Sequence, residues 1–279
     1  MSEADELKGR IVLVTGGGRG IGRAIALAFA TRGSYVALTG RTQAPLEAAA
    51  REIQGLGGKA LPLTCDVTKK PEIEAAKNAI RNEFGPVQIL VNNAGMAPAA
   101  GFLDMPDSLW EEVLSVNLNG TYYCCKLFLP EMVAAKWGRV INIASIVAKV
   151  AYPHTSAYTT SKHAVLGLTR VLALEMARSG VTVNAICPGY VETEMTLNNA
   201  RLMAQKTGKK LEEALGLFAA SSPQKRLIAP EEVAELAVML ASKAADGITG
   251  QAINVDGGAV MVSHLSDLRG AGKANERVG

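Results

Sequence analysis

The feature that most constrains the fold is a glycine-rich turn that follows an apolar, β-branched run beginning at Val12. The turn, Gly16-Gly-Gly-Arg-Gly-Ile-Gly22, leads into an apolar-periodic segment that predicts a helix from Ile21 to Arg32. A strand, a glycine turn and a helix N-terminus together form an anion site. Unpaired amides and the helix dipole face a phosphate there, and only residues without side chains let it approach. The start of the chain therefore predicts a phosphate-binding βα unit.

The spacing of this turn separates it from two common phosphate loops. Gly16, Gly20 and Gly22 follow a Gly-x-x-x-Gly-x-Gly pattern, which is not Gly-x-Gly-x-x-Gly. The turn is not a P-loop either, because Arg23-Ala24 stands where Lys-Ser/Thr is required. A purely structural role for the three glycines stays open at this point.

Strand-like runs alternate with helical patterns along the rest of the chain. This alternation predicts one parallel sheet covered by helices on both faces, which is an α/β, doubly wound sheet of the Rossmann type. With 279 residues and 48% apolar content, the chain can form it as a single domain over residues 1–264. A ligand is expected outside the carboxyl ends of the strands, where the strand order reverses. The predicted strands after the first are Tyr35 to Thr39, Ala60 to Thr64, Ile89 to Val91, Val140 to Ile143, Val181 to Ile186 and Ala252 to Val255.

A second signal is the pair Tyr158 and Lys162. These residues are one helical turn apart, so their side chains share a helix face. A free phenol titrates near pH ~10, and a neighbouring cation lowers that pKa by favouring the phenolate. Tyrosine then becomes a usable general acid or base. Ser145 ends the predicted strand before this helix, so its hydroxyl can meet the phenol over a substrate oxygen. Two exposed helix residues are the alternative reading of such a short motif.

Together, these motifs resemble the short-chain dehydrogenase/reductase family. The resemblance runs from about Lys8 to Gly258 and includes Asn92-Asn-Ala-Gly95, Asn117 and Pro188-Gly189 in family order. Each of these features also has an ordinary reading, as a turn, an exposed polar helix residue or a strand terminator. Asp66 also has two interpretations: by resemblance it binds the adenine, and otherwise it caps a helix.

The resemblance implies catalytic roles for four residues. Tyr158 would exchange a proton with the substrate oxygen, which Ser145 would hold, while Lys162 would lower the tyrosine pKa and bind the nicotinamide ribose. Asn117 would hold a water that links Lys162 to solvent. The implied cofactor-binding residues are Gly16, Arg19, Gly20, Ile21, Gly22, Arg41, Asp66, Val67, Asn93, Ala94, Gly95, Tyr158, Lys162, Pro188, Gly189, Val191 and Thr193.

The end of the second predicted strand indicates NADP(H) as the cofactor. NAD-type enzymes usually place an acid there, which would repel a 2′-phosphate, whereas this chain has Gly40 followed by Arg41. Arg19 lies inside the glycine turn, so two guanidinium groups can surround one phosphate. The alternative is that both arginines are solvated surface residues.

Within the family, the chain looks most like 3-oxoacyl-thioester and actinorhodin-type polyketide ketoreductases. The segment 193–229 would form a substrate lid, with a helical pattern from Ala200 to Phe218 that Gly208 interrupts. We expect its apolar residues to face the substrate, although a helix pair that packs in an oligomer is the alternative. These residues are Leu211, Leu215, Leu217 and Phe218.

Other substrates and one other function stay open. Val147 stands where the 3-hydroxybutyrate branch has a histidine, which counts against that branch. A broad alcohol, hydroxysteroid or xenobiotic carbonyl dehydrogenase is an alternative of the same family. A catalytically idle NADP-binding redox sensor is an alternative of a different class, which the intact catalytic residues disfavour.

By resemblance, the helices from about Leu109 to Lys136 and from Ser156 to Ala177 pair with their copies, which predicts a homotetramer of two-fold symmetry. Lys136 and Arg178 offer charge for an acidic acyl carrier protein, although scattered surface charge explains them as well. The apolar residues expected to exceed the needs of one sheet face are Tyr122, Tyr123, Leu127, Phe128, Val165, Leu168, Leu172 and Leu174.

Composition counts against several other classes of protein. A net charge of +3 with scattered cations argues against nucleic acid, and no apolar run predicts a membrane span. The polar first ten residues do not resemble a signal peptide, so a cytoplasmic protein is expected. The tail, residues 265–279, is predicted to be disordered. No metal is expected, because His154, His163 and His264 are dispersed, and the four cysteines, Cys65, Cys124, Cys125 and Cys187, are predicted to be buried thiols.

Overall fold

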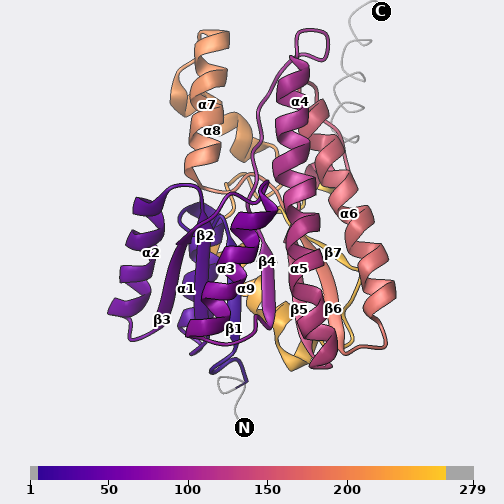
Figure 1. Ribbon diagram of the computed structural model, residues 1–279. Coiled ribbons are helices and arrows are strands. Elements are labelled where there is room, and N and C mark those ends of the chain that lie inside the picture. The colour runs from indigo at the N-terminus through magenta and orange to yellow at the C-terminus, as the bar shows by residue number, and fades with distance from the viewer. Residues whose placement is uncertain (1–5, 262–279) are drawn as a thin grey trace, which may run out of the picture.

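The computed structural model describes residues 6–261, which form one seven-stranded sheet with the order β3-β2-β1-β4-β5-β6-β7. Every neighbouring pair of these strands runs parallel, so the predicted doubly wound sheet is confirmed (Figure 1). The strands are β1 Ile11–Thr15, β2 Tyr35–Gly40, β3 Lys59–Thr64, β4 Ile89–Asn92, β5 Gly138–Ile143, β6 Val181–Pro188 and β7 Ala252–Val255.

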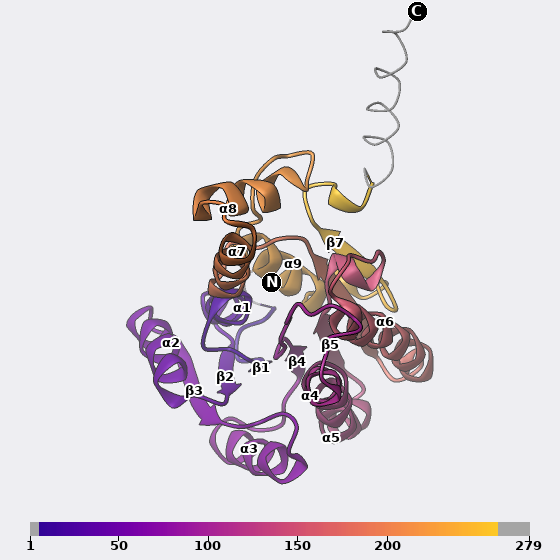
Figure 2. The ribbon, with the colours of Figure 1, turned by 90° about the horizontal axis from the view of Figure 1, so that it is seen from above.

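Helices connect the strands and cover both faces of the sheet (Figure 2). They are α1 Gly20–Ala30, α2 Gln43–Gly55, α3 Lys70–Glu83, α4 Asp107–Leu114, α5 Gly120–Ala134, α6 Ser156–Met176, α7 Glu194–Thr207, α8 Leu211–Ala220 and α9 Pro230–Ala241. A π-helical turn, Ser115–Asn119, joins α4 to α5. Figure 1 shows α7 and α8 standing beyond one end of the sheet, at the same end as the upper part of α4.

The alternation of side chains along β1 explains why the core has two parts. Val12 and Val14 pack into the cluster formed with α1, α2 and α9, whereas Ile11 and Leu13 pack into the cluster formed with α3, α5 and α6. All five residues of β1 are buried. A strand buried on both faces reads as a continuous apolar run, which is why the sequence predicts it well.

The strand order reverses between β1 and β4, and the glycine turn lies at the carboxyl end of β1. Gly16 has a φ of 64°, which favours glycine, and a Cβ there would lie 2.9 Å from the Nδ2 atom of Asn93. At Gly22, a Cβ would overlap the carbonyl oxygen of Gly16. Glycine at both positions therefore lets α1 approach the end of β1.

The helices expected to form an intersubunit face have a smaller exposed apolar surface than the sequence predicts. The prediction is wrong for Phe128 and Val165, which are buried within the subunit, Phe128 in the core cluster that α5 forms with α3 and the sheet. Tyr122 and Leu174 are exposed, the latter at 80% of its surface. The other four, Tyr123, Leu127, Leu168 and Leu172, are partly buried.

Two further predictions concern features that the fold displays. All four cysteines are buried and none forms a disulfide, as expected. Within residues 6–261, every helix is too short or too polar to cross a bilayer. The predicted disorder of the tail and the position of His264 lie outside the described residues.

Candidate active site

The glycine turn is fixed to the end of β4 by two side chains. The Thr15 hydroxyl accepts hydrogen bonds from the backbone amides of Asn93 and Ala94, both at 3.0 Å. The Asn93 Nδ2 atom donates to the carbonyl oxygens of Thr15 at 2.9 Å and Gly16 at 3.1 Å. The sequence interpretation did not single out Thr15. Thr15 could have been recognised as a hydroxyl residue at the last position of the strand that precedes the glycine turn.

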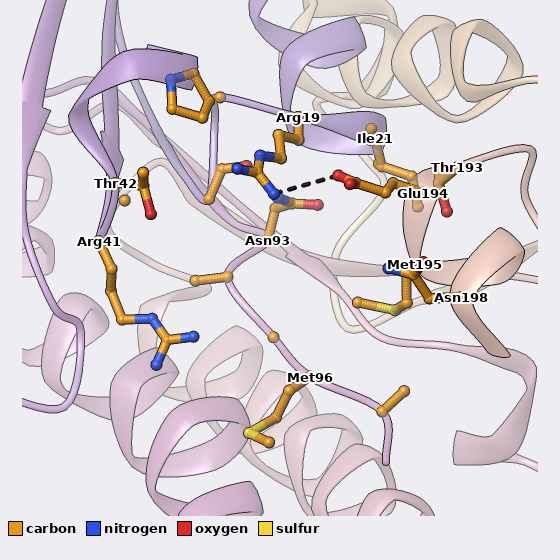
Figure 3. A pocket seen from close by; sticks show the side chains of 18 of the residues that line it. Arg19, Ile21, Arg41, Thr42, Asn93, Met96, Thr193, Glu194, Met195 and Asn198 are labelled. Atoms are coloured by element: carbon orange, nitrogen blue, oxygen red, sulfur yellow. Dashed lines mark hydrogen bonds and ion pairs between the residues drawn. The ribbon is translucent and has the colours of Figure 1, made fainter. Parts of the chain in front are cut away.

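A cavity of about 560 Å³ opens beside this turn (Figure 3). Amides at the start of α1 can receive a phosphate there, because the side chains that would block it are missing. The cavity is also lined by residues that were not predicted, including Thr42, Met96 and Glu194. The predicted cofactor-binding residues that line it are Gly16, Arg19, Gly20, Ile21, Arg41, Asn93, Ala94, Gly95 and Thr193.

Asp66 and Val67 do not line this cavity. The Asp66 carboxylate accepts hydrogen bonds from the amide and the hydroxyl of Thr68, at 3.0 and 2.9 Å. Burial raises the pKa of Asp66, but the Thr68 hydrogen bonds and the charge of Arg41 outweigh burial and hold it below its usual value. Val67 is buried, and its side chain packs against Gly120 at the start of α5. The structure thus gives the Asp66 carboxylate a turn-forming role.

Lys162 is buried in α6, and its Nζ atom donates a 2.7 Å hydrogen bond to the carbonyl oxygen of Ile143 at the end of β5. The same atom lies 5.8 Å from the centre of the Tyr158 ring. Burial lowers the pKa of Lys162 to about 8, because the ammonium loses its hydration. The structure therefore brings together the tyrosine and the lysine that the sequence paired.

The pKa of Tyr158 corrects one expectation. Burial of the phenol raises this pKa, and the Ser145 hydroxyl opposes the rise without reversing it. The predicted lowering by Lys162 is not found, because desolvation of the phenol dominates. Ser145 itself is buried just after β5, where its hydroxyl accepts a 3.3 Å hydrogen bond from the amide of Val147.

Asn117 lies in the π-helical turn and joins three segments. Its Nδ2 atom donates to the Met96 carbonyl and to the Ser161 hydroxyl, both at 3.0 Å, and its Oδ1 atom accepts from the Met96 amide at 2.9 Å. Ser161 in turn donates to the Tyr158 carbonyl at 2.7 Å. A Cβ on Gly95 would lie 3.2 Å from Asn117 Oδ1 and 3.6 Å from Lys162 Nζ. Asn117 and Lys162 therefore adjoin the cavity at Gly95, although none of the four predicted catalytic residues is among those that line it.

Pro188 ends β6, and Gly189 follows it against Asp256, whose Cα would lie 3.1 Å from an added Cβ. Neither residue lines the cavity, and nor does Val191, which is buried and bridged to Ile228. Gly22 does not line the cavity either; it packs against Gly16 and Asn93.

Two helices form in the predicted lid segment, although α7 begins at Glu194, before the predicted start at Ala200; Gly208 caps α7 with a φ of 69°. The prediction that their apolar residues face a substrate is wrong for Leu211, Leu215 and Phe218, which pack between α7 and α8. Phe218 stacks on Tyr190, with ring centres 4.4 Å apart and planes 4° from parallel. Two helices that pack as a pair bury the apolar side chains between them, and the periodic apolar residues of α7 and α8 fill this contact. Leu217 is half exposed, as are Met195 and Leu202 on α7.

Comparison with known proteins agrees with this geometry. The model of a family described as short chain dehydrogenase matches residues 10–203. A variant of the actinorhodin polyketide ketoreductase, solved with NADPH, is 38% identical with a TM-score of 0.88, over 90% of this chain and 97% of that one.

Two curated relatives carry different names. A 3-oxoacyl-[acyl-carrier-protein] reductase of Aquifex aeolicus is 39% identical over 254 residues, which are 91% of this chain and 98% of the relative. A D-beta-hydroxybutyrate dehydrogenase of Cupriavidus necator is 38% identical over 253 residues, 90% of this chain and 98% of the relative. Similarity of this degree does not separate the two activities.

Proposed function

This chain belongs to the short-chain dehydrogenase family, and from that premise we propose that it reduces a ketone to a secondary alcohol with NADPH. The observation that carries the proposal is the arrangement of Ser145, Tyr158 and Lys162 beside a glycine-turn cavity. A Cβ at Gly16 or Gly22 would clash with neighbouring atoms, so the turn requires glycine at both positions. A turn without these side chains lets a pyrophosphate approach its backbone amides. When bound, the nicotinamide supplies the hydride.

Tyr158 supplies the proton in this reaction. Because its pKa is raised, the phenol is protonated at neutral pH and can donate to the ketone oxygen as hydride reaches the carbonyl carbon. Ser145 holds the same oxygen with its hydroxyl. Lys162, mostly cationic at pH 7 with a pKa of about 8, stabilises the phenolate that remains. Asn117 supports the path by which a proton from solvent restores Tyr158.

The preference for NADPH rests on the charges around the cavity. β2 ends at Gly40, so no carboxylate stands there to bind ribose hydroxyls or repel a 2′-phosphate. Arg19 and Arg41 both line the cavity, and Figure 3 shows them on different sides of it. Guanidinium groups bind phosphate oxygens in a fork geometry, which favours NADPH over NADH.

The surroundings of Tyr158 favour an uncharged ketone group over a short keto acid. Its ring packs against a buried apolar cluster of Ile146, Val147 and Ala259. Val147 in this cluster stands where the 3-hydroxybutyrate branch has a histidine, so this polar group is missing beside Tyr158. A 3-oxoacyl thioester or a polyketide-like ketone is therefore the proposed substrate, with an acyl carrier protein as a candidate partner. A broad alcohol, hydroxysteroid or xenobiotic carbonyl dehydrogenase is the second candidate of the same family.

Assembly into a homotetramer belongs to the same proposal. Tyr122 on α5 and Val171 and Leu174 on α6 are exposed apolar residues, which an intersubunit contact would cover. Light scattering at micromolar concentration should return four times the mass of the chain. A monomeric mass would contradict this part of the proposal.

The activity is tested by following NADPH oxidation with acetoacetyl-CoA, a bicyclic ketone such as decalone, and a steroid ketone. Turnover of at least one ketone, faster with NADPH than with NADH, is the expected result. Tight NADPH binding without turnover of any of the three would favour the idle redox sensor instead.

A further inference from the structure

An ion pair crosses the cavity between two segments that are far apart in the sequence. Arg19 Nη1 in the glycine turn lies 3.2 Å from Glu194 Oε2, and both side chains are 60% exposed (Figure 3). Both residues line the same cavity. Arg41, the other guanidinium of the cavity, forms no ion pair with any residue that the structure describes.

The backbone holds Glu194 close to the glycine turn. Glu194 is the first residue of α7, and the preceding Thr193 caps this helix by accepting a hydrogen bond from the Thr196 amide at 3.4 Å. A Cβ on Gly20 would lie 3.1 Å from the Cγ2 atom of Thr193, so the start of α7 is packed on the turn. The carboxylate is therefore held near Arg19 by the fold.

A carboxylate at this position affects the two nicotinamide dinucleotides differently. The 2′-phosphate of NADPH adds about 1.5 to 2 negative charges at pH 7, which NADH lacks. Glu194 repels these charges and also occupies a guanidinium that would otherwise bind them. NADPH therefore has to displace Glu194 from Arg19, whereas NADH does not.

We propose that Glu194 is a cofactor-specificity residue that limits the preference for NADPH by competing with the 2′-phosphate for Arg19. This inference rests on the proposed NADPH-dependent function. It assigns to the start of the lid a second role, in which binding of the 2′-phosphate frees the first residue of α7 from the glycine turn.

The test measures NADPH and NADH dissociation constants by cofactor fluorescence for the wild type and Glu194→Gln. Glutamine keeps the shape of the side chain and removes its charge. At an ionic strength of about 20 mM, Glu194→Gln should bind NADPH about 2- to 5-fold more tightly, as expected for release of an exposed ion pair, with NADH nearly unchanged. The gain should shrink at about 0.5 M salt, where exposed charges are screened.

Two further variants separate competition for Arg19 from a general effect of charge. Glu192→Gln is the matched control, because Glu192 is exposed, lies two positions earlier and does not line the cavity. It should leave both affinities unchanged. In the Arg19→Ala background, Glu194→Gln should give little further gain, because the contested guanidinium is missing.

Several outcomes would overturn the inference. An equal change for NADPH and NADH would do so, and so would a gain that persists in full without Arg19. Weaker binding of both cofactors by Glu194→Gln would instead make Glu194 a ligand of the dinucleotide. If the wild type bound neither cofactor, the proposed function itself would fail, which these measurements distinguish from a failure of the Glu194 inference alone.

Discussion

The proposed catalytic cluster, Asn117, Ser145, Tyr158 and Lys162, and the cavity rim at Arg19 and Glu194 hold their polar groups in different ways. In the cluster, Asn117 and Lys162 are buried and each is hydrogen bonded to backbone groups. At the rim, the side chains of Arg19 and Glu194 are mostly exposed and, among residues 6–261, form an ion pair only with each other. The two regions adjoin through Gly95, and the backbone at Glu194 is packed on the glycine turn, but the side chains of the rim pair are not buried.

This difference separates chemistry from cofactor selection. A buried polar group costs a large part of its hydration unless a partner compensates it, so its position cannot change freely. An exposed ion pair contributes little and can exchange one partner for another. We therefore expect changes in the cluster to alter catalysis strongly, and changes at the rim to tune affinity.

The largest expected effect is a loss of kcat on changing a residue of the proposed catalytic cluster. Tyr158→Phe removes the proton donor and keeps the ring, so kcat for ketone reduction should fall by on the order of 10² or more while NADPH still binds. Steady-state kinetics and cofactor fluorescence measure the two quantities separately. Tyr35→Phe is the control, because Tyr35 begins β2 at the opposite end of the sheet. Near wild-type turnover by Tyr158→Phe would remove Tyr158 from the mechanism.

The next effect concerns the exposed side. Arg41→Ala should weaken NADPH binding by several-fold to ~100-fold, the loss of a charge-assisted contact of ~1.5–3 kcal/mol, and should barely change NADH binding. Arg51→Ala is the matched control, because Arg51 is exposed on α2 and does not line the cavity. Equal losses for both cofactors would show that Arg41 does not read the 2′-phosphate.

A smaller effect is expected from pH and again concerns the cluster. Because burial lowers the pKa of Lys162 to about 8, the ammonium is lost as the pH rises through that value. The kcat/KM for ketone reduction should therefore fall about tenfold per pH unit above pH 8. Tyr158, with a raised pKa, stays protonated over the same range, so the loss belongs to Lys162. A profile that stays flat up to pH 10 would contradict this assignment.

The same contrast explains what the sequence could predict. β1 and β6 are buried throughout, and their apolar runs made them recognisable. Tyr158 and Lys162 were recognisable because one helical turn fixes their relation. The π-helical turn at Asn117 was not, since it depends on hydrogen bonds to Met96 and Ser161 that the local sequence does not encode.

The direction of the apolar side chains on α7 and α8 and the Arg19–Glu194 ion pair were also not predicted. The periodic apolar residues of the lid were identified, but their direction depends on how α7 packs on α8, which sequence periodicity does not determine. Glu194 was missed because its partner Arg19 lies 175 positions away and both side chains are exposed. Surface charges of this kind have many available partners, so no local pattern selects one.

The smallest expected effect compares the lid with the sheet. Many helix positions in residues 196–223 are exposed, and the Tyr190–Phe218 stack joins this segment to the loop after β6, whereas β1 and β5 are buried throughout.

Amide hydrogen exchange should therefore be faster in the lid than in β1 or β5 without ligand. It should slow by several-fold when NADP⁺ and a nonreactive ketone analogue bind together, and less with NADP⁺ alone, because closing over the substrate covers Met195, Leu202 and Leu217, which are about half exposed. Lid amides as protected as the strands before any ligand is added would make α7 and α8 a fixed element. The case for a bulky acyl or polyketide-like substrate would then lose its main support.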